Sequence, residues 1–273
     1  MLTLDDPISH HSLINHAGIH PRLSSQGWLG IVLFCLGYPD EGFAQSSGAV
    51  AEARGLAHPP SLATSLSLNA RLLSLVGDNA ALDERTDELV AVATEQGFPF
   101  WRAQGTIFRG WVKVENGDVA EGISLLRSGS AAFRATGAEL WMPHYIALLA
   151  RACEIAGQIE EAVGLLDDAL QTVERTGERW FAAELNRHKG EVLLQQGDTE
   201  AAEELYLIAL SIAREQEAKM WELRAAGSLA RFRRDQGRRA EARDLLAPVY
   251  GWFTEGFGTP DLKEAKALLD ELT

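Results

Sequence analysis

The densest group of metal-binding side chains lies near the amino terminus and consists of four histidines: His10, His11, His16 and His20. Four imidazoles in so short a segment could hold a transition metal if a fold brought them together. The nearby carboxylates are those of Asp5 and Asp6, and the histidine spacing matches no familiar set of metal ligands. We therefore interpret the segment as a cap or a tail and predict that the protein binds no metal.

Catalytic motifs are missing from the sequence. It contains no GxxxxGK(S/T) phosphate loop, no HExxH zinc motif and no GxSxG nucleophile turn. The two cysteines, Cys35 and Cys153, lie far apart and outside any CxxC pair, which argues against a disulfide framework and a structural zinc site. We predict that the chain is not an enzyme and needs no cofactor.

Polar and aromatic side chains recur every forty residues and could form a binding surface. One set is Arg71, Trp111, Arg151, Glu191 and Arg231, and a second set is Gln104, His144, Glu184 and Arg224. In the middle of the chain these positions would form a mixed aromatic and charged patch, suited to a peptide segment or a small polar ligand: Trp111, His144, Arg151 and Glu191. The alternative for any one of them is an ordinary solvated position.

The elements that must position these residues are helices, and glycines mark where the helices end. One ladder of glycines has a spacing of forty residues: Gly37, Gly77, Gly117, Gly157, Gly197 and Gly237. A second ladder falls midway between its members: Gly97, Gly137 and Gly177. Between them, apolar residues recur with helical spacing, and a glycine at such intervals terminates a helix in the left-handed conformation. Each forty-residue unit is therefore predicted to be a helical hairpin, and stacked hairpins bury what a single one cannot.

Small residues support this interpretation, because two helices can cross closely only where side chains are small. They stand seven positions before each glycine of the first ladder: Gly30, Ala70, Gly110, Ala150, Gly190 and Ala230. Together with small residues in the second helix, this pattern resembles that of tetratricopeptide (TPR) repeats over residues 20–258. The resemblance implies that the first helix of each hairpin lines a concave groove, which would contain both sets of forty-spaced residues. Recurring aromatic residues are assigned to packing between hairpins: Trp101, Trp141, Phe181 and Trp221.

The amino-acid sequence of the repeats, above all over residues 173–180 and 250–266, resembles the carboxy-terminal arrays of large bacterial signalling proteins. In those proteins a class III adenylate/guanylate cyclase domain or a DNA-binding domain precedes a signal-transduction ATPase domain and then a TPR array. The resemblance implies a sensor or regulatory scaffold, without cyclic-nucleotide synthesis by this chain. Because such arrays continue upstream, it also implies a carboxy-terminal fragment or split gene product, and we expect self-association through an uncapped amino-terminal end.

The predicted fold is all-α, a right-handed α-solenoid of about six TPR-like hairpins with a carboxy-terminal capping helix. Residues 1–19 are expected to be an amino-terminal segment, and residues 259–273 the capping helix. The array between them divides into repeats at about 20–57, 58–97, 98–137, 138–177, 178–217 and 218–258.

Charge narrows the classes of partner. Lysine and arginine number 25 against 39 aspartate and glutamate, a formal net charge of −14, which disfavours nucleic acid and anionic membranes. The longest apolar run, residues 28–36, is too short to span a bilayer, and we expect a cytoplasmic protein. Residues 219–243 are basic instead. They could dock an acidic partner, or they could pair with the acidic hairpin before them, and the sequence leaves both readings open.

We therefore predict a non-catalytic scaffold or sensor that binds a protein segment or a small effector in its groove and regulates a cyclase or ATPase signalling domain. The alternative is a purely structural assembly or oligomerisation protein, whose groove would tolerate reversal of its charges.

Overall fold

The computed structural model describes residues 18–273, and in this range every regular element is a helix. Twelve helices form six hairpins, and a thirteenth follows the last hairpin, which confirms the predicted fold class. The helices are α2 (Pro21–Leu36), α3 (Pro39–Gly55), α4 (Pro59–Val76), α5 (Asn79–Glu95), α6 (Pro99–Glu115), α7 (Val119–Ala135), α8 (Met142–Ile155), α9 (Ile159–Thr176), α10 (Ala182–Gln195), α11 (Thr199–Glu215), α12 (Lys219–Asp235), α13 (Arg239–Tyr250) and α14 (Pro260–Glu271).

The turns within and between hairpins use the left-handed backbone region that the glycine ladders predict. Gly37 has φ 96° and Gly117 has φ 93°, a conformation that strains any residue with a Cβ atom. Two turns between hairpins lack glycine, and there Ala57 (φ 49°) and Glu217 (φ 54°) adopt the same conformation. The turn geometry is thus imposed by the stacking of the hairpins as well as by the local sequence.

The two helices of a hairpin cross closely at the small residues. A Cβ atom on Gly110 of α6 would lie 2.8 Å from the backbone nitrogen of Leu126 and 2.9 Å from the carbonyl oxygen of Gly122, both on α7. In the first hairpin, Gly30 and Gly42 face each other in the same way. Backbones in contact at these points leave no room for a side chain.

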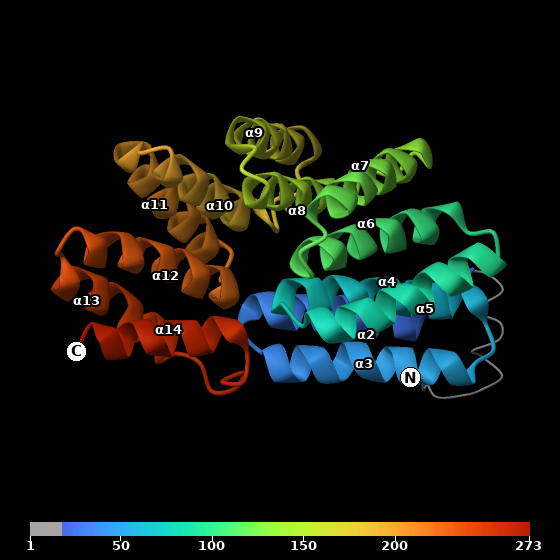
Figure 1. The fold of residues 1–273 in the computed structure, drawn as a ribbon. Helices are drawn as coiled ribbons and strands as arrows, with labels where there is room; N and C mark the ends of the chain where they lie inside the picture. The colour runs from blue at the N-terminus through green and yellow to red at the C-terminus, as the bar shows by residue number, and fades with distance from the viewer. Residues whose placement is uncertain (1–17) are drawn as a thin grey trace.

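The array curls until its two ends meet (Figure 1), so that α12, α14 and the segment between α13 and α14 lie beside α2 and α3. The backbone N–H groups of Asp40 and Glu41, at the start of α3, donate to the carboxylate of Glu255 at 3.0 and 3.1 Å. The N–H of Gly256 donates in return to Asp40 at 2.9 Å.

This closure covers part of the amino-terminal hairpin, and self-association through that end stays a prediction. Phe34 on α2 is fully buried, and its ring packs edge-on against Trp221 of α12, with the centroids 5.7 Å apart. The last hairpin therefore covers part of the first described one, because the curvature accumulated over six hairpins brings the two ends together. The carboxy-terminal end is capped as predicted, since α14 buries Leu262, Ala265 and Leu268 against the hairpin before it.

Candidate functional site

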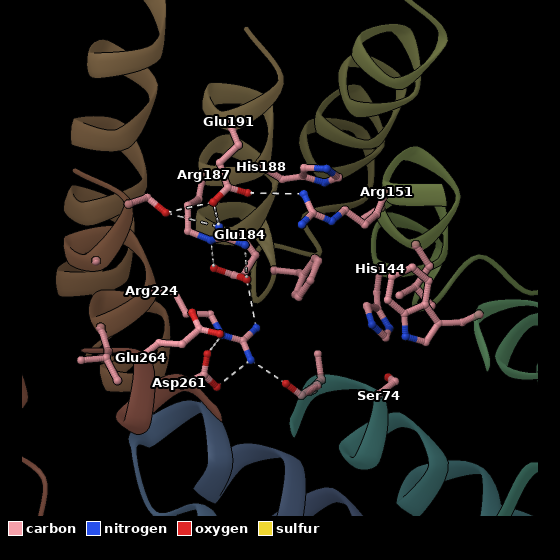
Figure 2. Close-up of a pocket in the computed structure, with 18 of the residues that line it drawn as sticks. Ser74, His144, Arg151, Glu184, Arg187, His188, Glu191, Arg224, Asp261 and Glu264 are labelled. Carbon is pink, nitrogen blue, oxygen red and sulfur yellow. Dashed lines mark hydrogen bonds and ion pairs between the residues drawn. The ribbon is translucent and has the colours of Figure 1, made fainter. Parts of the chain in front are cut away.

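The closed array encloses a cavity of about 470 Å³ on its inner side. Side chains from α4, α6, α8, α10, α12 and α14 line this cavity, which we call the polar cavity. One wall carries aromatic and apolar side chains, among them Trp111, Leu148 and Phe181. Arginine and carboxylate side chains from α10, α12 and α14 form a charged wall (Figure 2).

Seven of the nine groove residues predicted from the sequence line the polar cavity: Trp111, His144, Arg151, Glu184, Glu191, Arg224 and Arg231. They converge because the first helix of each hairpin lies on the inner side, and a spacing of forty residues gives every such helix the same rotation. Figure 2 labels His144, Arg151, Glu184, Glu191 and Arg224 among them, which project from neighbouring helices toward the same space.

Arg71 and Gln104, the other two predicted groove residues, lie in the protein interior and outside the cavity wall. Their exposed fractions are 0% and 2%. The Arg71 guanidinium stacks on Trp141, with 3.8 Å between its central carbon and the ring centroid. It also donates hydrogen bonds to Gln104, at 3.1 Å, and to the hydroxyl of Tyr145. Tight curvature covers these inner-face positions, so they form part of the core.

Glu184 is the centre of the charged wall. Its two carboxylate oxygens accept hydrogen bonds from Arg187, at 2.8 and 3.2 Å, and from Arg224, at 3.0 Å. Arg224 also forms a two-pronged pair with Asp261 on α14, at 2.7 and 2.9 Å, and donates to the carbonyl oxygen of Leu75 at the end of α4. One arginine therefore joins three parts of the array around the cavity.

Mutual neutralisation stabilises this wall. Burial by itself would raise the pKa of Glu184, but the guanidinium groups of Arg187 and Arg224 outweigh it and lower that pKa to about 2. Burial likewise opposes the charge on each arginine, and the neighbouring carboxylates raise the pKa of both Arg187 and Arg224. All three groups are therefore ionised at neutral pH.

A second charged cluster lies on α8 and α10. Arg151 donates to Glu154 at 2.8 Å and approaches Glu191 to 3.9 Å. Glu154 also contacts His188 at 2.7 Å, and although burial would raise the pKa of Glu154, its partners His188 and Arg151 lower it to about 2. The side chain of Arg151 remains 45% exposed, so a ligand in the cavity can reach it.

His144 differs from the charged residues because it is only 1% exposed and its Nδ1 atom has no hydrogen-bond partner among the described residues. Burial, followed by the positive charges of Arg71 and Arg224, lowers the pKa of His144 well below its ordinary value. The ring is therefore neutral at pH 7, and its Nδ1 atom is a buried polar group that no described residue satisfies.

Sequence reasoning missed several residues of this site. Arg187 and His188 lie on the same helix as the predicted Glu184, and their helical spacing from it could have identified them. Asp261 lies on the capping helix and Ser74 lies near the end of α4, and neither belongs to a set of predicted groove residues spaced forty apart. They reach the cavity only because the array closes.

Metal binding finds no support in the part of the chain that the structure describes, where no three histidine, cysteine, aspartate or glutamate side chains are grouped to hold an ion. His10, His11 and His16 lie outside the described residues. His20 directly precedes α2, and its backbone N–H donates to Ser61 at 2.8 Å. No helix within residues 18–273 is long and apolar enough to cross a bilayer.

The basic last hairpin is largely paired. Arg238 contacts Glu203 of the preceding hairpin at 3.0 Å, Arg231 contacts Glu264 at 2.9 Å, and Arg234 contacts Glu271. These contacts favour charge pairing over a free docking surface, and two of the three partners belong to the capping helix and not to the acidic hairpin.

Stacked helical hairpins with their first helices around a lined cavity define a TPR-like helical-repeat protein. No protein-family model matches the sequence. Among curated proteins, an uncharacterized protein of Rhizobium meliloti (strain 1021) is 26% identical over 226 residues, which cover 82% of this chain and 22% of the relative. The chain thus spans about a fifth of the length of that relative.

Solved structures share the fold at low sequence identity. A Rap protein complexed with Competence and Sporulation Factor matches with a TM-score of 0.65 and 13% identity, over 90% of this chain and 73% of that chain. A signal transduction ATPase with numerous domains, which has a tetratricopeptide repeat sensor and comes from Pyrococcus horikoshii, matches with a TM-score of 0.64 and 14% identity, over 97% and 39%. BtubC of P. vanneervenii has a TM-score of 0.55 and 18% identity, over 84% and 87%. These similarities establish the TPR-like fold.

Proposed function

We propose that this chain is a non-catalytic recognition module that binds a peptide segment or a small polar effector in the polar cavity. The observation that carries the proposal is the convergence of seven residues, equivalent by the forty-residue repeat, on one cavity. A repeat protein that served only as a spacer would have no need to gather varied side chains at its equivalent inner positions.

The walls suit a ligand that carries both apolar and charged groups. Trp111, Leu148 and Phe181 offer apolar contact, while Arg151 and Arg231 keep 45% and 41% of their side chains exposed. A peptide with an apolar side chain next to an acidic one would satisfy both walls.

A binding role fits the electrostatics of the cavity better than acid–base catalysis does. A general acid or base works best when its pKa lies near the working pH. Glu184 and Glu154 have pKa values of about 2 and are held by arginine or histidine partners, so neither is ready to exchange a proton at neutral pH. Fold similarity to a Rap protein and to a TPR sensor is consistent with binding.

Signalling is the proposed use of binding. The chain corresponds to about a fifth of its curated relative, and one similar structure is a signal transduction ATPase with a TPR sensor. We propose that occupancy of the cavity regulates a cyclase or ATPase signalling domain in the bacterial cytoplasm. Because Arg224 joins α4, α10 and α14 around the cavity, a ligand that contacts this wall would favour one curvature of the array over another.

Assembly is the second candidate, supported by apolar side chains exposed on the outer face of α2. Leu29 and Val32 are 44% and 47% exposed, which leaves an apolar surface at this end of the array. Light scattering over a hundredfold range of protein concentration tests this candidate. A constant mass of one chain would exclude self-association.

The test of recognition is a charge reversal inside the cavity, matched with one outside it. The double variant Arg151→Glu, Glu191→Arg inverts a pair on the cavity wall whose side chains are 45% and 25% exposed. The control Arg127→Glu, Glu161→Arg inverts a more exposed pair, at 50% and 43%, that joins α7 and α9 outside the cavity. Each purified protein is incubated with an array of 12-residue peptides and with a library of small polar metabolites.

We expect ligands that bind the wild type and the control, and that bind the cavity variant at least tenfold more weakly. Binding that is unchanged in the cavity variant, while its helical circular dichroism is retained, would refute recognition at this site. Equal loss in both variants would show that overall charge controls binding instead of the cavity.

A further inference from the structure

A second cavity, of about 380 Å³, lies at the seam where the array closes. α2 crosses there over the turns that precede α8, α10 and α12. We call this cavity the tryptophan pocket, after the four indoles in its wall: Trp28, Trp141, Trp180 and Trp221. It shares no lining residue with the polar cavity.

Two of the indoles, Trp180 and Trp221, use their polar edges elsewhere and leave ring carbons for this space. The Nε1–H group of Trp221 donates to the carbonyl oxygen of Trp180 at 3.0 Å. The Nε1–H of Trp180 donates to Glu178 at 2.9 Å. Trp28 stacks on Trp141 with centroids 4.7 Å apart, and Trp180 meets Trp141 edge-on at 5.2 Å. These mutual contacts hold the rings in place and form a rigid apolar wall.

Trp141 has a backbone conformation that a bulky residue rarely adopts. Its φ is 75°, in the left-handed region, and its N–H donates to both carboxylate oxygens of Glu178 at 3.0 Å. An aromatic residue held in this region is strained, and the surrounding structure must compensate for the strain. Trp141 and Trp221 also pack between hairpins against Trp180, the role that the sequence suggested for them.

The pocket has no ionised group in its wall among the described residues. Cys35 is the titratable side chain that lines it, and burial raises the pKa of this thiol to about 12, so that it stays protonated. Behind the rings, the guanidinium of Arg71 stacks on Trp141, and the carboxylate of Glu178 accepts a hydrogen bond from Trp180. These two groups carry charges of opposite sign. Moving an anion into this space would remove its hydration without supplying an opposite charge, and a cation would meet the charge of Arg71, which already lies on Trp141.

One polar group remains on the wall. Gln216 donates its side-chain N–H to the carbonyl oxygen of Arg179 at 2.9 Å, which leaves the amide oxygen as a hydrogen-bond acceptor. Water against this apolar wall finds few polar partners. The half-exposed side chains of Val32 and Leu140 form the rim, so that the space is open to solvent.

From this geometry we infer that the tryptophan pocket binds a small neutral aromatic molecule of one or two fused rings that carries at most one hydrogen-bond donor. The rings of the ligand stack between Trp28, Trp180 and Trp221, and its donor reaches the amide oxygen of Gln216. This site is independent of the polar cavity and of the function proposed for it.

Calorimetric titration of the full chain tests this assignment. Indole and 2-naphthol are the neutral probes, and naphthalene-2-sulfonate and 2-naphthyltrimethylammonium are the charged ones. We expect saturable binding of the neutral probes at one site per chain, with a negative heat-capacity change, and at least tenfold weaker binding of both ions. Absence of saturable binding to the folded chain would overturn the inference, and so would equal or tighter binding of either ion.

Two matched lysine substitutions locate the site. Val32→Lys places a cation at the pocket rim, where Val32 is 47% exposed, and Leu207→Lys does the same on α11, where Leu207 is 45% exposed and outside the pocket. We expect Val32→Lys to weaken indole binding at least tenfold and Leu207→Lys to leave it unchanged. Equal loss in both variants would overturn the assignment.

Two further controls concern the polar cavity and self-association. Arg151→Glu, in the polar cavity, should leave indole binding unchanged, and a parallel loss would show that the two cavities are not independent. If the wild-type chain is a dimer that Val32→Lys converts to a monomer, a second copy occupies the pocket and the small-molecule assignment is wrong.

Discussion

Replacing Glu184 by glutamine removes one negative charge from the wall of the polar cavity and keeps the shape of the side chain. The magnitude follows from the pKa of this carboxyl group, which is about 2 in the folded protein against an ordinary value of 4.5. Each pKa unit corresponds to about 1.4 kcal/mol, so the ionised carboxylate contributes about 3 kcal/mol to folding at neutral pH. Glu184 is only 4% exposed, and solvent therefore screens little of this contribution.

The pH dependence gives the prediction its sign. Because the folded pKa is lower than the unfolded one, the contribution is complete above about pH 5 and is lost as the pH falls toward 2. We expect Glu184→Gln to lower the free energy of unfolding by about 3 kcal/mol at pH 7 but by only about 1 kcal/mol at pH 3. Urea unfolding followed by circular dichroism at both pH values measures the two differences.

Glu264→Gln is the matched control, because Glu264 lines the same cavity and pairs with Arg231 but is 65% exposed. An exposed pair contributes little, so this variant should stay within about 0.5 kcal/mol of the wild type at both pH values. A loss below about 1 kcal/mol for Glu184→Gln at pH 7, or the same loss at pH 7 and pH 3, would refute the electrostatic account of the wall.

Three further predictions test the fold itself. Gly110→Ala should lower the free energy of unfolding by about 1 to 3 kcal/mol, because its Cβ atom would meet α7 backbone atoms at 2.8 and 2.9 Å. Gly164→Ala has open space around it and should raise the free energy of unfolding by about 0.5 kcal/mol. Equal effects of the two substitutions in thermal unfolding would mean that the helix crossing is misplaced. Asp40→Ala removes a hydrogen bond between the two ends of the array and should lower the free energy of unfolding by about 1 kcal/mol. Backbone amides in the segment before α14 should then exchange faster with solvent, and unchanged exchange would argue against closure in solution. In a Cys153→Ser background, Cys35 of the folded chain should react with a thiol-specific disulfide reagent at pH 8 at least a hundredfold more slowly than Cys35 of the chain unfolded in urea. The reason is that burial raises the pKa of this thiol to about 12. Fast labelling of the folded chain would contradict that burial.

The candidate site was predictable from the sequence where it depends on repeat phase. Arg151, Glu191 and Arg231 stand forty residues apart, and this interval returns each to the same side of successive helices. The same reasoning placed Arg71 and Gln104 in the groove, where the structure instead buries them beneath α8. Phase indicates which side of a helix faces inward, but not whether a neighbouring helix covers that side.

Local rules were sufficient for the sequence to determine the helices and their turns. A residue such as Gly117 marks a left-handed turn because only glycine adopts that conformation without strain, and the helices between the turns follow from apolar spacing within a few residues. Small residues such as Gly110 identified the helix crossings for the same reason, since their effect acts over one contact distance.

Only the tertiary structure decided how far the array curls and what that curling brings together. The closure joins Arg224 to the carbonyl oxygen of Leu75 and to Asp261, and it places α2 across the turns that complete the tryptophan pocket. Curvature is the sum of small packing angles over six hairpins, and each angle depends on the shapes of many side chains at once. No local sequence pattern specifies the total curvature of the array, and for this reason the two cavities could be identified only in the folded chain.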